Sequence, residues 1–227
     1  MENNYFFIDG SALLSDVKRL RQEDVSLNGR RLSLVQFAQA FTGHYLQQYH
    51  GGSYRRFTFY FVQEDDRLDR DLILPDSSIP GVISDLRIER CGKSIKEFRV
   101  AKEWLEKNNA PQYVTECIYR SEKAVDTQIC ADALQLAAVG KLDRLFLYTN
   151  DYDFVPLCRA LRSLGLNINL LRIHSFSVNK SLAQECDAFD VLHPNVIHSL
   201  FLPLPEAPQP AQPGAQPDAG TDRKLAP

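Results

Sequence analysis

An apolar run at residues 145–148 restricts the fold of this chain more than any other feature of the sequence. Because it is too short for a helix and is bounded by turn residues, it predicts a strand that is buried on both faces. A helical pattern follows at once, with apolar residues from Phe154 onward at three- and four-residue spacing. Two carboxylates, Asp151 and Asp153, occupy the turn between the strand and the helix. In an open α/β sheet, ligands bind at this edge.

Short strand-like runs alternate with helical patterns along the rest of the chain. The further predicted strands are residues 5–8, 57–62, 86–91, 113–119 and 167–171. The predicted helices are residues 11–21, 34–49, 95–108, 126–139, 154–164 and 181–189. Residues 64–84, where acidic and basic side chains alternate, are expected to form a solvated loop. This order predicts an α/β fold with a mostly parallel, doubly wound central sheet.

Composition argues against several classes of protein. A formal net charge of −3 excludes a protein that coats nucleic acid by bulk charge, although a local basic groove stays open. The five cysteines form no CxxC pair, so we expect neither a zinc site nor a disulfide framework, and reduced cysteines indicate a cytoplasmic protein. No apolar stretch is long enough to span a membrane or has the flanks of a signal peptide, so no membrane partner is expected.

The end of the chain differs in composition from the rest. Residues 1–200 are expected to form one domain, and residues 201–227 a disordered tail rich in Pro, Ala and Gln. Seven of the 12 prolines lie in this tail, which is too poor in large apolar groups to pack. The sequence leaves open whether the tail binds a protein partner and whether the chain forms a homo-oligomer.

Acidic residues from three separate parts of the chain fall at the expected carboxyl edge of the sheet. Asp9 ends the first strand, and Asp126 is expected to cap a helix, with Asp132 six residues later. They join Asp151 and Asp153. Carboxylates gathered this closely repel one another unless a cation lies between them. Oxygen ligands without His or Cys suit Mg²⁺ or Mn²⁺, which would activate water for attack on a phosphodiester.

Each of these residues also fits an ordinary structural role. Asp9 suits a turn, Asp153 suits a helix N-cap, and Asp132 suits a solvent-facing salt bridge. Two basic residues in the segment before the helix, Arg120 and Lys123, could hold substrate phosphates, and they equally suit a solvated loop. The gathering of the acids, rather than any one of them, therefore carries the prediction of a metal site.

Three segments resemble, in their order and spacing, the motifs of the NYN domain, a PIN-like nuclease family. They are residues 7–11 (FIDGS), 123–134 (KAVDTQICADAL) and 149–157 (TNDYDFVPL). The resemblance covers about residues 4–193 and leaves the tail outside. It implies a Rossmann-like α/β/α sandwich with metal-dependent endoribonuclease activity, and hence RNA as the substrate.

Carried over by position, this resemblance assigns site residues. The implied catalytic and metal-binding acids are Asp9, Asp126, Asp151 and Asp153, with Asp132 as a further metal candidate. The polar residues beside them are the candidate substrate-binding groups: Ser11, Arg120, Lys123, Thr149 and Asn150. Many relatives carry Ser-Gly before the last acidic pair, where this chain has Thr-Asn. Because threonine keeps the hydroxyl, we expect the geometry of the turn to be preserved.

Two other functions stay open alongside a ribonuclease. One is a catalytically weak NYN-like module that keeps the fold and binds RNA or a protein partner; its affinity for RNA would be insensitive to loss of Asp9. The other is a phosphohydrolase of the haloacid-dehalogenase type, which also uses aspartates on a Rossmann-like sheet. That chemistry needs a second acid two residues after the first, and Ser11 occupies this place.

Overall fold

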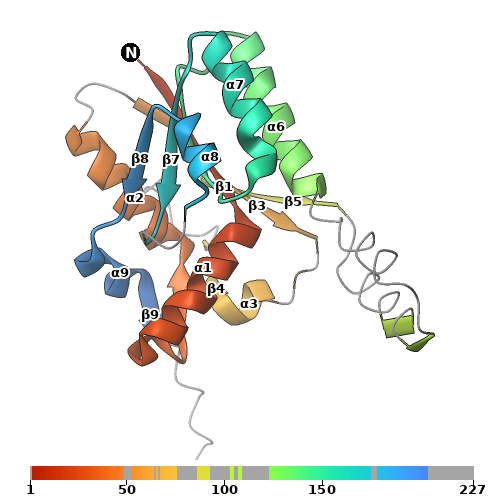
Figure 1. The fold of residues 1–227 in the computed structure, drawn as a ribbon. Helices are drawn as coiled ribbons and strands as arrows, with labels where there is room; N and C mark the ends of the chain where they lie inside the picture. Colours follow the sequence, from red (N-terminus) through yellow and green to blue (C-terminus); the bar gives the residue numbers. More distant parts are fainter. Residues whose placement is uncertain are drawn as a thin grey trace, which may run out of the picture.

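The computed structural model describes residues 2–48, 53–63, 65, 67–75, 86–92, 103–104, 107–108, 123–174 and 178–203. A central sheet of six strands has the order β5-β3-β1-β6-β7-β8, and every neighbouring pair is parallel (Figure 1). The strands are β1 (Asn3–Asp9), β3 (Ser53–Val62), β5 (Leu86–Cys91), β6 (Arg144–Tyr148), β7 (Asn167–Arg172) and β8 (Ala188–Val191). The predicted α/β/α fold with a mostly parallel sheet is confirmed.

Helices cover both faces of this sheet. On one face lie α1 (Gly10–Glu23), α2 (Leu34–Gln48) and α9 (Pro194–Leu200), and on the other lie α6 (Lys123–Ala138), α7 (Val155–Ser163) and α8 (Lys180–Gln184). The alternation along β1 shows how the two cores form. Phe6 and Ile8 belong to the α1 side, whereas Tyr5 and Phe7 belong to the α6 side. A strand with apolar residues on both faces must be covered on both.

The chain changes direction across the sheet at β1. The first strands proceed from β1 to β3 and β5 on one side, and the later strands proceed from β6 to β7 and β8 on the other. The carboxyl ends of β1 and β6 therefore flank a topological switch point, which in open α/β sheets is the usual place for a ligand. Both ends carry acidic residues that the sequence singled out.

A second sheet of three short strands was not predicted. It has the order β4-β2-β9, formed by β2 (Arg30–Ser33), β4 (Leu72–Ile73) and β9 (Phe201–Pro203). β2 pairs in parallel with β4 and antiparallel with β9. These strands have two to four residues, too few for a period-2 pattern to register in the sequence.

The expectation of a solvated loop at residues 64–84 is wrong for its described part. Helix α3 (Arg67–Asp71) forms here and buries Leu68, and it leads directly into β4. Asp65 and Asp71 are themselves buried, each in an ion pair with arginine. Charge alternation suggested solvent exposure because the sequence does not show which charges are paired.

Other boundaries also differ from the sequence-based expectations. The helix predicted at 181–189 ends at Gln184, and β8 follows as an edge strand of mixed polarity. The strand predicted at 113–119, most of the helix at 95–108 and the tail beyond Pro203 lie outside the described residues. Within the described part of the chain, none of the helices combines the length and apolarity needed to cross a bilayer.

Candidate active site

Asp9 ends the central strand β1 and is buried. One carboxylate oxygen, Oδ1, accepts hydrogen bonds from the backbone N–H groups of Ser11 (2.9 Å) and Ala12 (3.3 Å), so Asp9 is the N-cap of α1. The other oxygen, Oδ2, accepts a hydrogen bond from the hydroxyl of Thr149 at 2.9 Å. These three donors fix the orientation of the carboxylate at the switch point between β1 and β6.

Gly10 is needed here for space rather than for its backbone freedom. A Cβ at this position would lie 2.1 Å from Cδ1 of Phe61 and 2.5 Å from the carbonyl oxygen of Tyr60. Gly10 is not among the glycines with positive φ, and it is the first residue of α1. The first residue of α1 therefore lies directly against the neighbouring strand β3, at a distance that leaves no room for a side chain.

Thr149 joins Asp9 to the acidic turn that follows β6. It is fully buried, and its hydroxyl oxygen accepts a hydrogen bond from the backbone N–H of Asp151 at 3.2 Å while it donates to Asp9. Asp151 in turn caps the short 3₁₀ helix η3 (Tyr152–Phe154), because its Oδ1 accepts from the N–H of Asp153 at 2.9 Å. The N-cap is thus Asp151, whereas the sequence suggested Asp153.

The same turn is anchored from the far side by helix α8. Oδ1 of Asn150 accepts a hydrogen bond from the backbone N–H of Asn179 at 2.8 Å. Asn179 is itself the N-cap of α8, accepting from the N–H groups of Ser181 and Leu182. The side-chain oxygen of Asn150, a candidate substrate-binding group, is therefore engaged in a hydrogen bond within the protein. The carboxylates of Asp151 and Asp153 stay exposed to solvent, where a substrate can reach them.

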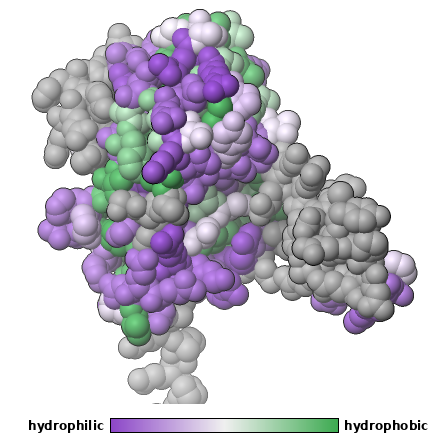
Figure 2. Space-filling model, viewed as in Figure 1, coloured by the Kyte–Doolittle hydropathy of each residue, from purple (hydrophilic) through white to green (hydrophobic). Residues whose placement is uncertain are grey.

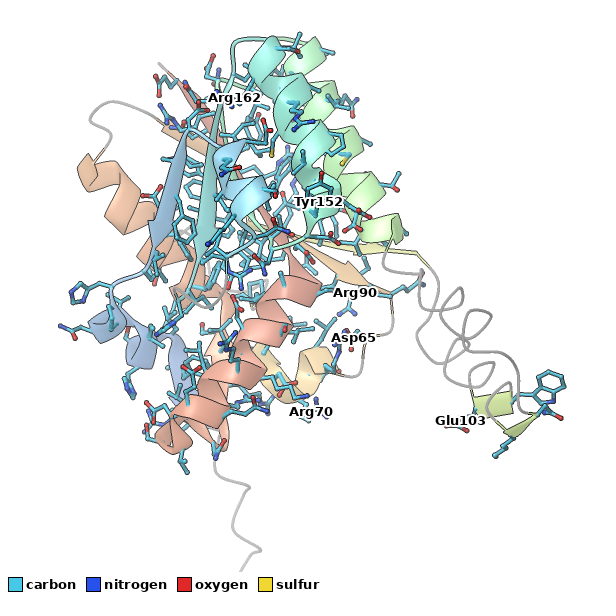
Figure 3. All side chains as sticks on the ribbon, in the orientation of Figure 1. Asp65, Arg70, Arg90, Glu103, Tyr152 and Arg162 are labelled. Carbon is cyan, nitrogen blue, oxygen red and sulfur yellow. The ribbon has the colours of Figure 1, made fainter. Side chains whose placement is uncertain are left out.

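Helix α6 brings the third acidic segment to the same edge. It packs against β1, β3, β5, η3 and α7, and Tyr152 of η3 lies beside its first turns (Figure 3). Asp126 is half-buried in the first turn of α6, which begins at Lys123, so the prediction that Asp126 caps this helix is wrong. The side chain of Lys123 and the whole of Arg120 lie outside the described part of the structure.

Asp132 has partners away from this turn. Its Oδ2 accepts a hydrogen bond from the hydroxyl of Tyr60 at 2.8 Å, and its Oδ1 accepts one from Nε2 of Gln128 at 2.8 Å. Burial, reinforced by the negative charge of Asp132, raises the pKa of Tyr60 well above its ordinary value, so the phenol stays a donor. Asp132 lies six residues along α6 from Asp126, about 9 Å along the axis, so the two carboxylates do not share a turn.

The carboxylates do not form a ready-made metal cage. Among the described residues, no three His, Cys, Asp or Glu side chains lie close enough together to hold a metal ion. Mg²⁺, however, usually keeps several waters and takes only one or two protein carboxylates, with substrate phosphates completing its shell. Asp9 and the exposed turn at Asp151, joined through Thr149, fit that mode of binding.

The sequence profile of the NYN domain matches residues 6–193. The chain belongs to the NYN domain family. NYN domains form a PIN-like nuclease family, so the fold is that of a nuclease, a class of hydrolases that act on nucleic acids. The matched range includes all three acidic segments, which contain Asp9, Asp126, Asp151 and Asp153.

One solved structure resembles this NYN domain, a protein of unknown function from Vibrio parahaemolyticus. The similarity covers 88% of this chain and 96% of that chain, with 14% sequence identity and a TM-score of 0.44. No curated protein matches the sequence significantly.

A buried charged group supports the NYN site from the α1 side of the sheet, and sequence reasoning missed it. Oδ1 of Asp16 accepts a hydrogen bond from Nη2 of Arg172 at 2.6 Å, and Oδ2 accepts one from the hydroxyl of Tyr148. The guanidinium also lies over the Tyr148 ring, 5.4 Å from its centroid. Burial acts to raise the pKa of Asp16 and outweighs the opposing effect of Arg172.

This group fixes the strand end that precedes Thr149. Tyr148 is the last residue of β6, Arg172 is the last residue of β7, and Asp16 lies in α1. A signal was present in the sequence, since Asp16 interrupts the buried stripe of α1, three residues after Leu13 and four before Leu20. Nothing local identifies its partner, which lies 156 residues away.

Proposed function

We propose that this NYN domain is a metal-dependent endoribonuclease that hydrolyses RNA phosphodiester bonds with Mg²⁺ or Mn²⁺. The observation that carries the proposal is the link from Asp9 through Thr149 to the Asp151 turn. It lies at the topological switch point of a parallel sheet, in a chain of a nuclease family. A buried carboxylate is linked there, through Thr149, to a turn that carries exposed carboxylates, at the place where an α/β sheet binds its ligand.

The acidic residues would have different roles, because some are buried and others are exposed. Asp9 is held by three donors, so its carboxylate keeps one orientation when substrate enters. Asp151 and Asp153 are exposed on this turn, and half-buried Asp126 lies in the first turn of α6, a helix that packs against η3. A bound divalent cation would act as a Lewis acid on the scissile phosphate. In this scheme Asp9 and Asp151 would hold the cation together with water and phosphate oxygens, and Asp126 and Asp153 would act on it through its bound waters.

Cleavage of a labelled single-stranded RNA by the purified full chain tests this proposal. We expect cleavage with Mn²⁺ or Mg²⁺, none in EDTA, and a loss of at least about 100-fold in Asp9→Asn and Asp151→Asn. The matched control is Asp143→Asn. Asp143 accepts hydrogen bonds from Asn3 at the opposite, amino-terminal edge of the sheet, and asparagine can still accept one. Equal cleavage by Asp9→Asn and the wild-type protein would refute the proposal.

The runner-up is an NYN module that binds RNA or a protein without cleaving it. It is favoured by one observation, the lack of a three-acid group among the described residues. The Asp9→Asn variant distinguishes the two functions. A binding module would keep its RNA affinity in this variant, and neither the variant nor the wild-type protein would show metal-dependent turnover. A ribonuclease loses turnover when this carboxylate is neutralised.

A further inference from the structure

A cavity of about 750 Å³ lies beside the acidic edge, between α1, α3 and the short 3₁₀ helix η1 (Val25–Leu27). Its lining mixes apolar, polar and charged residues, and most of the charged ones are basic. The charged residues in the lining are Lys18, Arg21, Arg67, Arg70 and Asp71. Asp65 and Arg70 flank α1 in Figure 3, and the surface over α1 is largely hydrophilic in the same view (Figure 2).

The positive charge continues beyond this cavity. A smaller neighbouring cavity of about 290 Å³ shares Arg21, Arg70 and Asp71 with the first and adds Arg30 and Arg31. In the part of the chain that the structure describes, six cationic side chains and one carboxylate line the two cavities. A protein with a formal net charge of −3 has therefore concentrated cations on one surface, which creates a local field that attracts anions.

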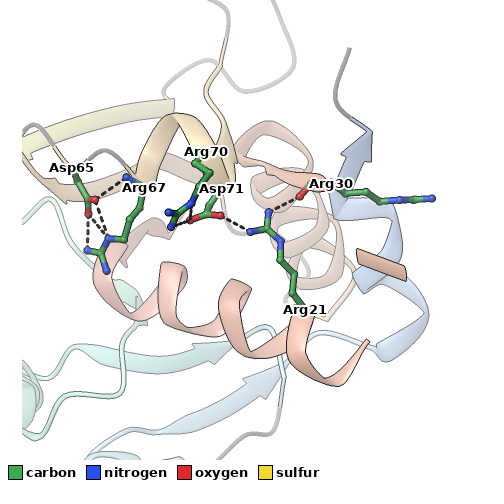
Figure 4. Close-up of polar contacts among 6 residues, drawn as sticks. All are labelled: Arg21, Arg30, Asp65, Arg67, Arg70 and Asp71. Atoms are coloured by element: carbon green, nitrogen blue, oxygen red, sulfur yellow. Dashed lines mark hydrogen bonds and ion pairs between the residues drawn. The ribbon is translucent and has the colours of Figure 1, made fainter. Parts of the chain in front are cut away.

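Ion pairs with two carboxylates hold Arg21, Arg67 and Arg70 in place, and the cations still outnumber these carboxylates (Figure 4). Asp71 accepts from both Arg21 and Arg70, and buried Asp65 accepts from Arg67 through both carboxylate oxygens. Burial opposes the charge on Asp71, but the hydrogen bonds and charges of the two arginines lower its pKa, so it stays ionised. Ordering by carboxylates reduces the entropy that flexible arginines lose when a ligand binds.

One face of α1 connects this basic surface with the candidate active site. Ser11, Ser15, Lys18 and Gln22 follow one another at four-, three- and four-residue spacing, so they lie on the same side of the helix. The N–H of Ser11 is bonded to Asp9, whereas Ser15, Lys18 and Gln22 line the cavity. At 1.5 Å per residue, Lys18 lies roughly 10 Å along the axis from Ser11.

The chemistry of the lining selects the part of a nucleic acid that it contacts. Among the described residues of the lining there is no aromatic side chain, so they offer no platform on which a base could stack. Arginine and lysine side chains instead match phosphate oxygens, and such contacts position a strand without reading its sequence. We propose that the two neighbouring cavities form one α1–α3 groove, which binds backbone phosphates of the RNA strand whose scissile bond lies at Asp9. The proposal rests on the function proposed above.

The test measures RNA binding in EDTA, where cleavage does not interfere. The probe is a fluorescein-labelled oligouridylate, and the protein is the full chain carrying Lys18→Gln and Arg70→Gln. Loss of two phosphate contacts should lower the slope of log affinity against log salt by about 1.4, which at 0.15 M salt is roughly a tenfold weaker affinity. The matched control, Lys141→Gln with Arg162→Gln, removes the same charge from exposed positions at the opposite end of the sheet.

The outcomes separate this groove from the proposed catalysis. Equal RNA affinities in the groove variant and the control variant would overturn the groove assignment, even if Asp9→Asn abolishes cleavage. Weaker binding in the groove variant alone, with wild-type protein that cleaves no RNA, would support the groove and refute the nuclease proposal. Lys18→Glu serves as a second variant that should fold normally, because Lys18 is exposed. Reversing the charge should weaken RNA binding more than neutralising it with Lys18→Gln.

Discussion

Replacing Arg172 by methionine tests the buried group that supports the active-site turn. The Arg172 and Asp16 side chains are only 4% and 5% exposed, so methionine would leave the Asp16 carboxylate buried without its cation. Methionine keeps most of the unbranched stem, which limits the cavity that the change creates. We therefore expect the cost to be chiefly electrostatic.

The magnitude follows from the proton that Asp16 would have to bind. Its pKa is already raised by burial, and loss of Arg172 raises it further. Keeping the carboxyl protonated at pH 7, against an unfolded pKa of about 3.9, costs up to about 4 kcal/mol at 1.36 kcal/mol per pH unit. This agrees with the roughly 3–5 kcal/mol observed when buried ion pairs lose one partner. For a domain of this size it corresponds to a fall of roughly 8–16 °C in Tm.

The pH dependence gives the sharper check. A group whose pKa is raised in the folded state makes the protein less stable as the pH rises. The loss of unfolding free energy in Arg172→Met, relative to the wild-type protein, should therefore shrink as the pH falls. We expect about 1.5 kcal/mol at pH 5, compared with about 4 kcal/mol at pH 7. Urea unfolding followed by circular dichroism at pH 5, 6 and 7 measures it.

Two controls complete the experiment. Asp16→Asn combined with Arg172→Met removes both charges and should recover most of the stability with little pH dependence. Arg159→Met breaks the exposed pair with Glu185, where water screens the charges, and should leave the midpoint nearly unchanged. A deficit below about 1 kcal/mol at pH 7, or one that does not narrow toward pH 5, would refute the reasoning.

Two further sets of substitutions test the packing at Gly10 and the hydrogen bonds of Thr149. Gly10→Ala should destabilise the fold by roughly 1–3 kcal/mol in thermal melts, because the new methyl group would meet the backbone carbonyl of Tyr60. Gly43→Ala in α2, where a Cβ meets nothing within 4 Å, should be neutral or stabilising, and equal effects at both sites would contradict the packing argument. Thr149→Val removes the donor to Asp9 and the acceptor for Asp151, and should reduce RNA cleavage at saturating substrate while Thr149→Ser largely restores it; wild-type turnover in the valine variant would exclude a positioning role for this hydroxyl.

Local patterns predicted most of the elements that position the site. The buried strands β1 and β6 and the helices α2 and α7 followed from short-range signals. In the structure Ser33 accepts from the N–H of Gln36 at the start of α2, and Gly165 has a positive φ just after α7. Such features depend on residues a few positions apart. Periodicity, capping and glycine conformation are encoded at that range.

Features that depend on distant partners did not follow from local patterns. The first two residues of edge strand β8 were predicted as helix, since four residues of mixed burial carry no clear period. The first turn of α6 extends three residues before Asp126, and only packing against β1 and η3 shows this start. Asp132 was a metal candidate through the family resemblance, and in the structure it accepts a hydrogen bond from Tyr60, 72 residues away in the sequence.

By itself, the sequence determined the alternation of strands and helices, the apolar faces that must be covered, and the acids that end particular strands. The tertiary structure alone decided which of those acids meet, which are taken up by hydrogen bonds, and where the arginines around α3 gather. The physical reason is range: a backbone pattern is set by neighbours within a turn or two, whereas the surroundings of a charge depend on whichever segment the fold brings against it.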